Sequence, residues 1–459
     1  MVTLTRISKL PLPKSYGPLG NLPLLKKGKM VQSFMTLADE YGSIFQFRLP
    51  GRVSTIVSDP LLVKELSDES LFTKTIGPAL KNVQAFTGDG LFTAESSDPN
   101  WYKAHHILRP CFSQKAMKTY HDKMVDITLQ LLEKWGTLKS LNVSQDMTRL
   151  TLDTIGLCGF NYRFHSLKND ELHPFIASMI RGLEESMKQI QRSSIQRSLM
   201  VKTKRQFQKD IQTMFQLVDE VIALRRSSEC EGEGDFLSHM LRGRDPNTGE
   251  NLTDENIRYQ IMTLLIAGHE TTSGLLSFAI YFLMKNQEKL EKAYEEVDRV
   301  FIDDIPTYEQ VKQLTYIRKV LQETLRLWPT APAYAVKALE DTVIGEGIPI
   351  HKEQQVMILL PQLHRNKEVW GDDVEAFIPE RFEAIKEIPR HAYKPFGNGR
   401  RACIGQYFAM HEAALVLGMI LKNFELIDKD QYHLKIKEML TLKPDQFVIN
   451  VKHREKHLI

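Results

Sequence analysis

The chain has 459 residues, of which 42% are hydrophobic and 25% charged, so it is long enough to bury a large core. Sixty Lys and Arg residues against 57 Asp and Glu residues leave a formal net charge of +3. This near balance argues against a nucleic-acid binder, whose affinity comes from neutralising phosphates.

The four cysteines form no CxxC pair: Cys111, Cys158, Cys230 and Cys403. This spacing argues against a disulfide framework and a tetra-cysteine zinc site, and it favours a reducing compartment. Residues 1–25 contain four prolines and no long apolar run, so neither a secretory signal nor a membrane span is predicted there. We therefore expect a cytoplasmic protein without a membrane span.

The first part of the chain predicts mixed structure. Residues 30–42 have helical spacing, and 43–48 and 52–57 read as strands joined by a turn at Pro50 and Gly51. Ser113 is a candidate N-cap for a helix over 113–135, and the apolar spacing continues over 144–160. The pattern thus becomes strongly helical after the first hundred residues.

The rest of the chain is mainly helical and ends in strands. Residues 191–206 are polar and basic, which predicts an exposed, mobile connection, and 227–234 read as a loop. A clear helix is predicted over 406–423, and strands over 355–360 and 446–451. No repeat or domain linker appears, so we expect one domain over 1–459 that is mainly α with a small β part.

Residues 261–283 are almost wholly apolar except for a polar cluster in the middle that includes Glu270. A membrane span would place this carboxylate at mid-bilayer, at a cost of about 3 kcal/mol. A long helix through the centre of a folded core explains the pattern better. Because buried polar groups need partners, the cluster is expected to line a cavity.

The sharpest motif is the loop over residues 396–405, which contains Phe396, Gly399, Arg401, Cys403 and Gly405 directly before the 406–423 helix. Its glycines let the backbone approach a bulky planar group, and the following helix favours a thiolate. The plain alternative is a buried, inert cysteine. A nucleotide loop also matches formally, but no predicted βαβ unit surrounds it.

The complete FxxGxRxCxG pattern resembles the haem-binding loop of the cytochrome P450 superfamily. The resemblance implies the fold of that family, with a long central helix over a buried haem, and makes the Cys403 thiolate the axial ligand of the haem iron.

The second motif lies in the apolar helix and includes Ala267, Gly268, Glu270 and Thr271. A zinc-protease helix would need a histidine where Ser273 stands, so that interpretation fails. Gly268 leaves room beside the helix, and the Thr271 hydroxyl can bond a carbonyl one turn back. A polar patch satisfied within the core is the alternative. The segment resembles the oxygen-activation helix of the family, which implies that Glu270 and Thr271 guide protons.

Glu323 and Arg326 form an i,i+3 pair, which is usually a surface feature of small energy. Here apolar neighbours predict burial, and a buried pair demands further hydrogen bonds. The resemblance adds Arg381 as the third member of a Glu–Arg–Arg core, which we assign to folding and to support of the cysteine loop.

Trp101 and His105 lie one helical turn apart on one face. Indole and imidazole nitrogens, with Arg401 as a third donor, suit a haem propionate. Core packing of Trp101 and a surface position for His105 are the alternative.

Beyond the motifs, the chain resembles the haem domain of the self-sufficient bacterial fatty-acid hydroxylase flavocytochromes. The resemblance implies haem b in this chain, and FMN, FAD and NADPH in a reductase that lies outside it. It also implies insertion of one oxygen atom from O2 into a C–H bond near the chain terminus of a medium- or long-chain fatty acid or a similar lipophilic molecule. Basic residues such as Lys394 and Arg400 could receive the acidic FMN domain, or be solvated charges.

The resemblance also carries substrate positions, each of which is otherwise plain core or surface: Arg52, Leu80, Val83, Phe92, Leu183, Ala267, Ala331 and Leu440. Arg52 matches a cation that pairs with the carboxylate, and Phe92 matches the aromatic that covers the substrate side of the haem. The tyrosine that assists the carboxylate in the family is Ile56 here, and Thr87 replaces a smaller apolar residue. Rival functions are a haem-thiolate peroxygenase or isomerase, and a non-enzymatic haem sensor or electron carrier.

Overall fold

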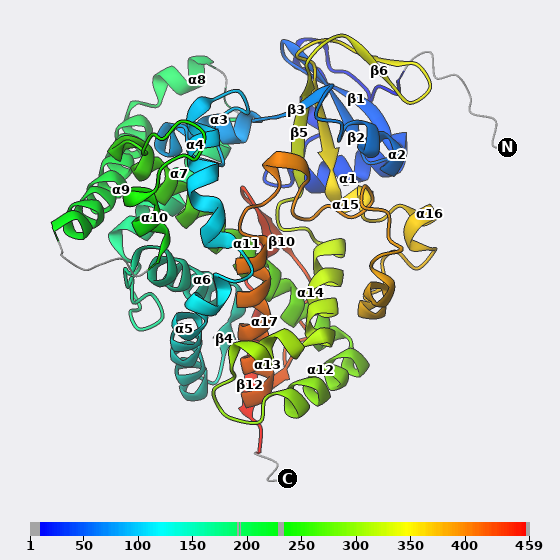
Figure 1. Cartoon of the computed structure of the whole chain (residues 1–459). Helices are drawn as coiled ribbons and strands as arrows, with labels where there is room; N and C mark the ends of the chain where they lie inside the picture. The colour runs from blue at the N-terminus through cyan, green and yellow to red at the C-terminus, as the bar shows by residue number, and fades with distance from the viewer. Residues whose placement is uncertain (1–9, 191, 193, 228–233, 456–459) are drawn as a thin grey trace. The chain divides into compact units, whose positions relative to one another are not determined.

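The computed structural model describes residues 10–190, 192, 194–227 and 234–455 (Figure 1). Cys230 and most of the loop predicted over 227–234 lie outside the described residues. The described chain divides into two compact units. The first combines the residues up to Gly77 with Gln322–Cys403, and the second combines Pro78–Leu321 with the residues from Ile404 onward.

The first unit is built on a five-stranded sheet with the strand order β1-β2-β8-β5-β3. The strands are β1 (Ile44–Leu49), β2 (Arg52–Val57), β3 (Phe72–Thr75), β5 (Ala333–Ala338) and β8 (Gln355–Leu359). Only β2 and β8 pair in parallel within this sheet, and the other pairs are antiparallel. Gly51 has a φ of +76° in the β1–β2 turn, so the predicted hairpin is confirmed together with its turn.

A hydrophobic core lies against this sheet and includes Val63, Phe72, Val356 and Ile358. The remaining elements of the unit are short: α1 (Met30–Tyr41), α2 (Pro60–Glu65), α15 (Leu360–Leu363), α16 (Lys367–Trp370) and the two-stranded β6 (Thr342–Ile344) and β7 (Ile348–Ile350). Helix α14 (Thr315–Leu327) begins in the second unit and ends in the first.

The second unit is mainly helical. Its helices are α3 (Pro78–Thr87), α4 (Pro99–Leu108), α5 (Met117–Thr137), α6 (Val143–Phe160), α7 (Pro174–Gln189), α8 (Ser194–Leu199), α9 (Val201–Ser227), α10 (Phe236–Arg242), α11 (Asp254–Lys285), α12 (Gln287–Val300), α13 (Tyr308–Gln313) and α17 (Gln406–Asn423). Two small sheets accompany them, made of β4 (Leu141–Asn142), β12 (Val448–His453) and β9 (Phe424–Ile427), and of β10 (Ile436–Glu438) and β11 (Leu442–Pro444). The mainly α class with a small β part is confirmed.

Helix α11 is the long apolar helix that the sequence predicts, and it packs against α3, α6, α9, α17 and β11 of the same unit (Figure 1). Nearly all of its middle is buried. The room predicted beside Gly268 is taken by Ile155 of α6, because an added Cβ on Gly268 would lie 3.0 Å from that side chain. The Thr151 hydroxyl of α6 donates to the carbonyl of His269 at 2.9 Å. Gly268 is therefore a point of close helix packing.

Two local predictions are wrong. Helix α5 begins at Met117 and not at Ser113, because the Ser113 hydroxyl accepts from the backbone of Ala116 and closes a turn before the helix. The basic segment 191–206 is not a connection in its described part, which forms α8 and the start of α9. Polar, charged residues also suit exposed helix surfaces, so polarity alone does not distinguish an exposed helix from a connecting loop.

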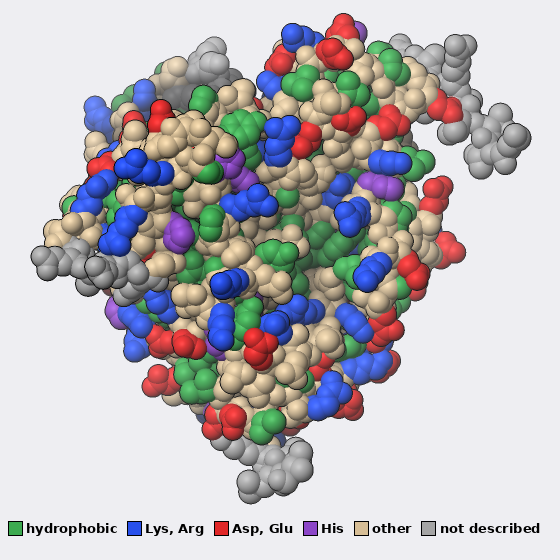
Figure 2. All heavy atoms as spheres, in the orientation of Figure 1, with side chains coloured by type: hydrophobic (Ala, Val, Ile, Leu, Met, Phe, Trp, Pro, Cys, Tyr) green, Lys and Arg blue, Asp and Glu red, His purple; other side chains and the backbone are tan. Residues whose placement is uncertain are grey.

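On the face drawn in Figure 2, Lys and Arg side chains occur together with Asp and Glu side chains. Among the described residues, no helix has the combined length and apolarity that a bilayer crossing requires.

Candidate functional site

The cysteine loop of the first unit is closed by its own backbone. The N–H of Cys403 donates to the carbonyl of Phe396 at 2.8 Å. Gly397 and Gly399 have φ angles of +72° and +65°, which side-chain-bearing residues rarely adopt. Gly405 is the N-cap residue of α17 and provides no side-chain cap. The geometry explains why glycines stand at the two positions 397 and 399, just before the basic residues of the loop.

Two residues from the N-terminal part of the chain anchor this loop, and no sequence pattern pointed to either of them. Glu69 accepts the N–H of Arg400 at 2.7 Å, and a Cβ on Gly399 would lie 2.2 Å from the same carboxylate oxygen. The Lys74 Nζ donates to the carbonyl of Arg401 at 3.2 Å. These contacts join residues more than 300 positions apart, which local patterns do not reveal.

The electrostatics of the loop single out Cys403 among the described cysteines. Cys111 and Cys158 are buried, and burial raises the pKa of both thiols, to about 12 for Cys111. Cys403 is exposed within its unit and lies near Lys74, whose pKa is lowered to about 8 by burial and by Arg401. Neighbouring cations favour a thiolate. They also suit the carboxylates of a haem, so the donor set fits the implied group.

Lys394 corrects the expectation of a basic docking face. Its side chain is buried, it donates to the Asn398 side chain at 2.9 Å, and burial lowers its pKa to about 8. Arg400 is exposed but pairs with Glu69 at 3.3 Å. Both residues therefore support the loop from within the first unit.

On α11 of the second unit, one face differs from the rest. Between Gln260 and Ile280, the residues that are not fully buried are Ala267, Gly268 and Thr271. They lie on one side of the helix because their spacing is one turn. The Thr271 hydroxyl donates to the carbonyl of Ala267 at 2.8 Å, as the sequence predicted. A small, half-buried face with one hydroxyl suits a helix that lines a cavity.

The Glu270 side chain faces strand β11 and the residue just before it, within the second unit. It accepts from the Thr441 hydroxyl at 2.8 Å and lies 3.6 Å from the Lys443 Nζ. Burial opposes its ionisation most strongly, but Lys443, His269 and Thr441 together lower the pKa of its carboxyl. Burial lowers the pKa of the adjacent His269. The carboxylate is therefore ionised at neutral pH while His269 is neutral.

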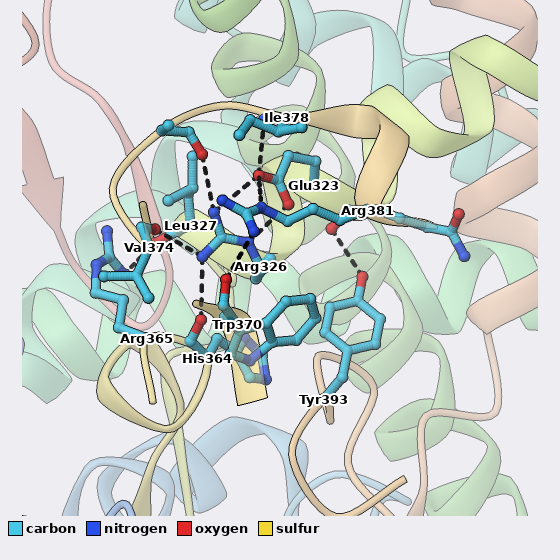
Figure 3. Close-up of polar contacts among 12 residues, drawn as sticks. Glu323, Arg326, Leu327, His364, Arg365, Trp370, Val374, Ile378, Arg381 and Tyr393 are labelled. Carbon is cyan, nitrogen blue, oxygen red and sulfur yellow. Dashed lines mark hydrogen bonds and ion pairs between the residues drawn. The ribbon is translucent and has the colours of Figure 1, made fainter. Parts of the chain in front are cut away.

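The predicted Glu–Arg–Arg cluster is present in the first unit (Figure 3). Arg326 donates to both carboxylate oxygens of Glu323, at 2.6 and 2.8 Å, and both side chains are fully buried. Arg381 lies 3.6 Å from the same carboxylate. Further donors of Arg326 reach the carbonyls of His364, Val374 and Ala376.

His364 connects this cluster to the cysteine loop, a link that sequence reasoning missed. Its ring accepts the backbone N–H of Lys394 at 3.0 Å, and its carbonyl accepts from Arg326 (Figure 3). Burial, followed by the charge of Arg326, lowers the pKa of His364 to about 3. A neutral imidazole can thus keep accepting from the segment that leads into the loop.

Trp101 and His105 stack on one face of α4, with ring centroids 4.8 Å apart. Trp101 is buried and its indole N–H donates to the carbonyl of Leu91 at 3.3 Å, while His105 is half-buried. The helical spacing was therefore predicted correctly. A bond from Trp101 to a propionate would compete with its bond to Leu91.

The expected substrate residues fall into both units. In the second, Leu80, Phe92 and Leu440 are half-buried, whereas Val83 and Leu183 are buried. In the first, Arg52 and Ala331 are exposed. Ile56 is buried in the sheet, and the Thr87 hydroxyl is satisfied by the carbonyl of Val83 at 3.1 Å.

Glu412 on α17 is a buried acid that the sequence did not single out. Burial raises the pKa of its carboxyl to about 8. Between the ordinary value of 4.5 and about 8, the folded chain holds a proton that the unfolded chain releases. Stability therefore falls as the pH rises through this window, by up to about 1.4 kcal/mol per pH unit.

We expect Glu412→Gln to flatten this dependence, because the amide does not titrate. Thermal unfolding between pH 5 and pH 9 measures the effect. An unchanged slope in the variant would show that Glu412 is already ionised in the folded chain.

Residues 10–451 match the family model described as cytochrome P450. The chain is 59% identical over 455 residues to a bifunctional cytochrome P450/NADPH–P450 reductase of Bacillus cereus, and equally to one of Bacillus subtilis. A self-sufficient cytochrome P450 monooxygenase of Aspergillus terreus is 41% identical over 446 residues. These alignments cover 98%, 98% and 96% of this chain, but only 43%, 43% and 42% of the relatives.

The match extends over nearly the whole chain and includes the cysteine loop, α11 and the Glu–Arg–Arg cluster. The geometry of these three features agrees with the similarity, and the chain belongs to the cytochrome P450 family.

Proposed function

We propose that this chain is the haem domain of a haem-thiolate monooxygenase that hydroxylates fatty acids or similar lipophilic molecules, in which the Cys403 thiolate would hold the iron of haem b. The observation that carries the proposal is the half-buried face of α11, which is formed by Ala267, Gly268 and Thr271. None of these three residues offers the strong ligand that would close the iron site of a haem sensor.

When bound, haem supplies the iron that activates O2, so that one oxygen atom enters a C–H bond and the other becomes water with two electrons and two protons. Cys403 would hold this group from the loop that Glu69 and Lys74 anchor. Arg401 and Lys74 of the first unit are the candidates for its carboxylates, since the Trp101 N–H of the second unit is already used by the carbonyl of Leu91. The protein's contribution is to bind, to orient and to deliver protons.

Proton delivery falls to Thr271 and Glu270. The Thr271 hydroxyl is held by the carbonyl of Ala267, and its oxygen keeps a free lone pair as an acceptor. Glu270 is ionised, so it can accept a proton. Because its carboxylate accepts the Thr441 hydroxyl, it must give up that hydrogen bond before it passes a proton on. Lys443 of strand β11 is the cation beside Glu270.

We expect Thr271→Ala to divert reducing equivalents from product to peroxide and to lower coupling by at least about tenfold. The ratio of hydroxylated product to NADPH consumed measures this effect. Thr272→Ala is the matched control, because Thr272 is buried one position away. Equal coupling in Thr271→Ala and in the wild type would rule out the relay.

A long-chain carboxylic acid is the substrate that the exposed Arg52 favours. This guanidinium lies at the start of β2, and Ile56 on the same strand adds no polar group. The carboxylate is therefore held by a single exposed cation, a contact of modest energy. Amides and alcohols of similar chain length consequently lose less affinity relative to the acid than they would if a second polar side chain also held the carboxylate.

We expect Arg52→Ala to weaken fatty-acid binding up to about fivefold and to leave binding of the matching alcohol unchanged. Titrations of the protein with acids and alcohols of several chain lengths, followed by the spin state of the iron, measure both affinities. Arg48→Ala, which removes an exposed arginine from the neighbouring strand β1, is the control. Equal losses for acid and alcohol would remove the carboxylate role of Arg52.

The electrons would come from NADPH through a P450 reductase, in line with the names of the bifunctional relatives. FMN and FAD are the carriers that the family resemblance implies for that reductase. We also propose a cytoplasmic location, which the unbridged Cys111, Cys158 and Cys403 support. Turnover that requires O2 and NADPH together with a P450 reductase tests the proposal. Product formed from peroxide alone would instead indicate a peroxygenase.

A further inference from the structure

The loop that carries Phe92 is fastened to α11 by a ladder of buried amides. Gln260 accepts the N–H of Leu91 at 2.9 Å, and its own amide donates to the Asn256 side chain at 3.1 Å. Asn256 donates in turn to Asp89 at 2.8 Å. Both amide side chains are buried. Two bonds therefore connect one turn of α11 to the residues just before Phe92, and a third, within the helix, holds the two amides together.

The same loop lies so close to the helix that two of its glycines have no room for a side chain. A Cβ on Gly90 would lie 2.1 Å from the Thr263 hydroxyl and 2.9 Å from the Tyr259 carbonyl. A Cβ on Gly88 would lie 2.4 Å from the Tyr259 ring. The backbone of the loop thus lies directly on α11, and glycine is the residue that permits this approach.

A second set of bonds holds the loop from the side of α4. Asn100 donates to the other carboxylate oxygen of Asp89 at 2.7 Å, and the Trp101 indole donates to the carbonyl of Leu91 at 3.3 Å. Both backbone polar groups of Leu91 are therefore used, the N–H by Gln260 and the carbonyl by Trp101. Phe92 follows directly, so its backbone position is set by these contacts.

We propose that Gln260 and Asn256 are specificity-determining positioning residues, which fix Phe92 through Leu91 and Asp89 and thereby select the carbon atom that is hydroxylated. The inference rests on the proposed function, because it takes Phe92 as the aromatic beside the substrate. Neither amide needs to touch substrate or haem in order to act in this way. Their effect is to restrict one loop to one position, which narrows the product distribution.

The test uses the holoprotein with NADPH, a P450 reductase and dodecanoic acid. Gln260→Met keeps the size of the side chain but removes both amide groups. We expect the exchange of the Leu91 amide hydrogen to become about tenfold faster, and the ratio of hydroxylated positions to change severalfold. Haem content and the spectrum of the reduced CO complex should stay as in the wild type.

Two further variants sharpen the comparison. Gln260→Glu keeps the acceptor for Leu91 but loses the donor to Asn256, so it should restore only part of the wild-type product ratio, whereas Gly90→Ala should shift that ratio by pushing the loop off α11. Ser277→Ala is the matched control, because it removes a buried hydroxyl bond of α11 away from the loop. This control should leave the product ratio unchanged.

The outcomes separate the inference from the proposed function. A wild type that does not oxidise the fatty acid contradicts the proposed function itself. A wild type that does so, with an unchanged product ratio in Gln260→Met and in Gly90→Ala, overturns the positioning role. A change of similar size in Ser277→Ala would also overturn it, since the effect would then be a general response to destabilising α11.

Discussion

Cys403→Ser is expected to abolish the red-shifted Soret band of the reduced CO complex and to remove monooxygenase activity. The physical reason is the donation from a thiolate to the iron, which an alcohol oxygen does not reproduce. Among the described cysteines, Cys403 is the exposed one, and Lys74 beside it favours the charged sulfur. The absorption spectrum of the reduced, CO-treated variant measures this effect, and activity should fall below detection.

Cys111→Ala is the matched control for this experiment. Cys111 is buried, and burial raises the pKa of its thiol to about 12, which keeps it protonated and unsuited to metal binding. The control should keep the band and the activity of the wild type. Retention of the thiolate band in Cys403→Ser would exclude Cys403 as the ligand.

Arg326→Met is expected to destabilise the protein by about 3–5 kcal/mol. The change leaves the Glu323 carboxylate buried without its main partner, and it removes donors from the carbonyls of His364 and Val374. Because His364 also accepts from the backbone of Lys394, the loss should reach the cysteine loop and reduce haem retention. Urea unfolding and the haem content of the purified variant measure the two effects.

Arg163→Met provides a surface pair for comparison, since Arg163 contacts Asp126 at 2.6 Å with both side chains close to half exposed. Its cost should stay below about 1 kcal/mol. The double variant Glu323→Leu with Arg326→Met should be less destabilised than Arg326→Met alone, because it leaves no buried charge behind. Similar costs for Arg326→Met and Arg163→Met would contradict the structural role of the buried cluster.

Features coded by local patterns were predictable from the sequence. The helix over 406–423 and the hairpin at Gly51 agree with the structure, because periodic apolar residues and turn glycines act over a few positions. The burial of Glu323 and Arg326 also followed from their apolar neighbours. The start of α5 was missed because a serine caps an isolated turn as readily as a helix.

Features that depend on distant parts of the chain were not predictable in this way. Glu69 and Lys74 hold the cysteine loop across more than 300 residues, and nothing in their local sequence indicates it. The burial of Lys394 was missed for the same reason, because a lysine beside a glycine-rich loop is usually solvated. The direction of Glu270 toward Lys443 also depends on a strand far along the chain.

X-ray absorption at the iron edge of the purified protein, prepared with ample haem, tests the central claim most directly. The account predicts one sulfur atom in the first coordination shell of the wild type, and its loss in Cys403→Ser. A shell that holds only nitrogen and oxygen atoms in the wild type, or a preparation that takes up no haem at all, would contradict it.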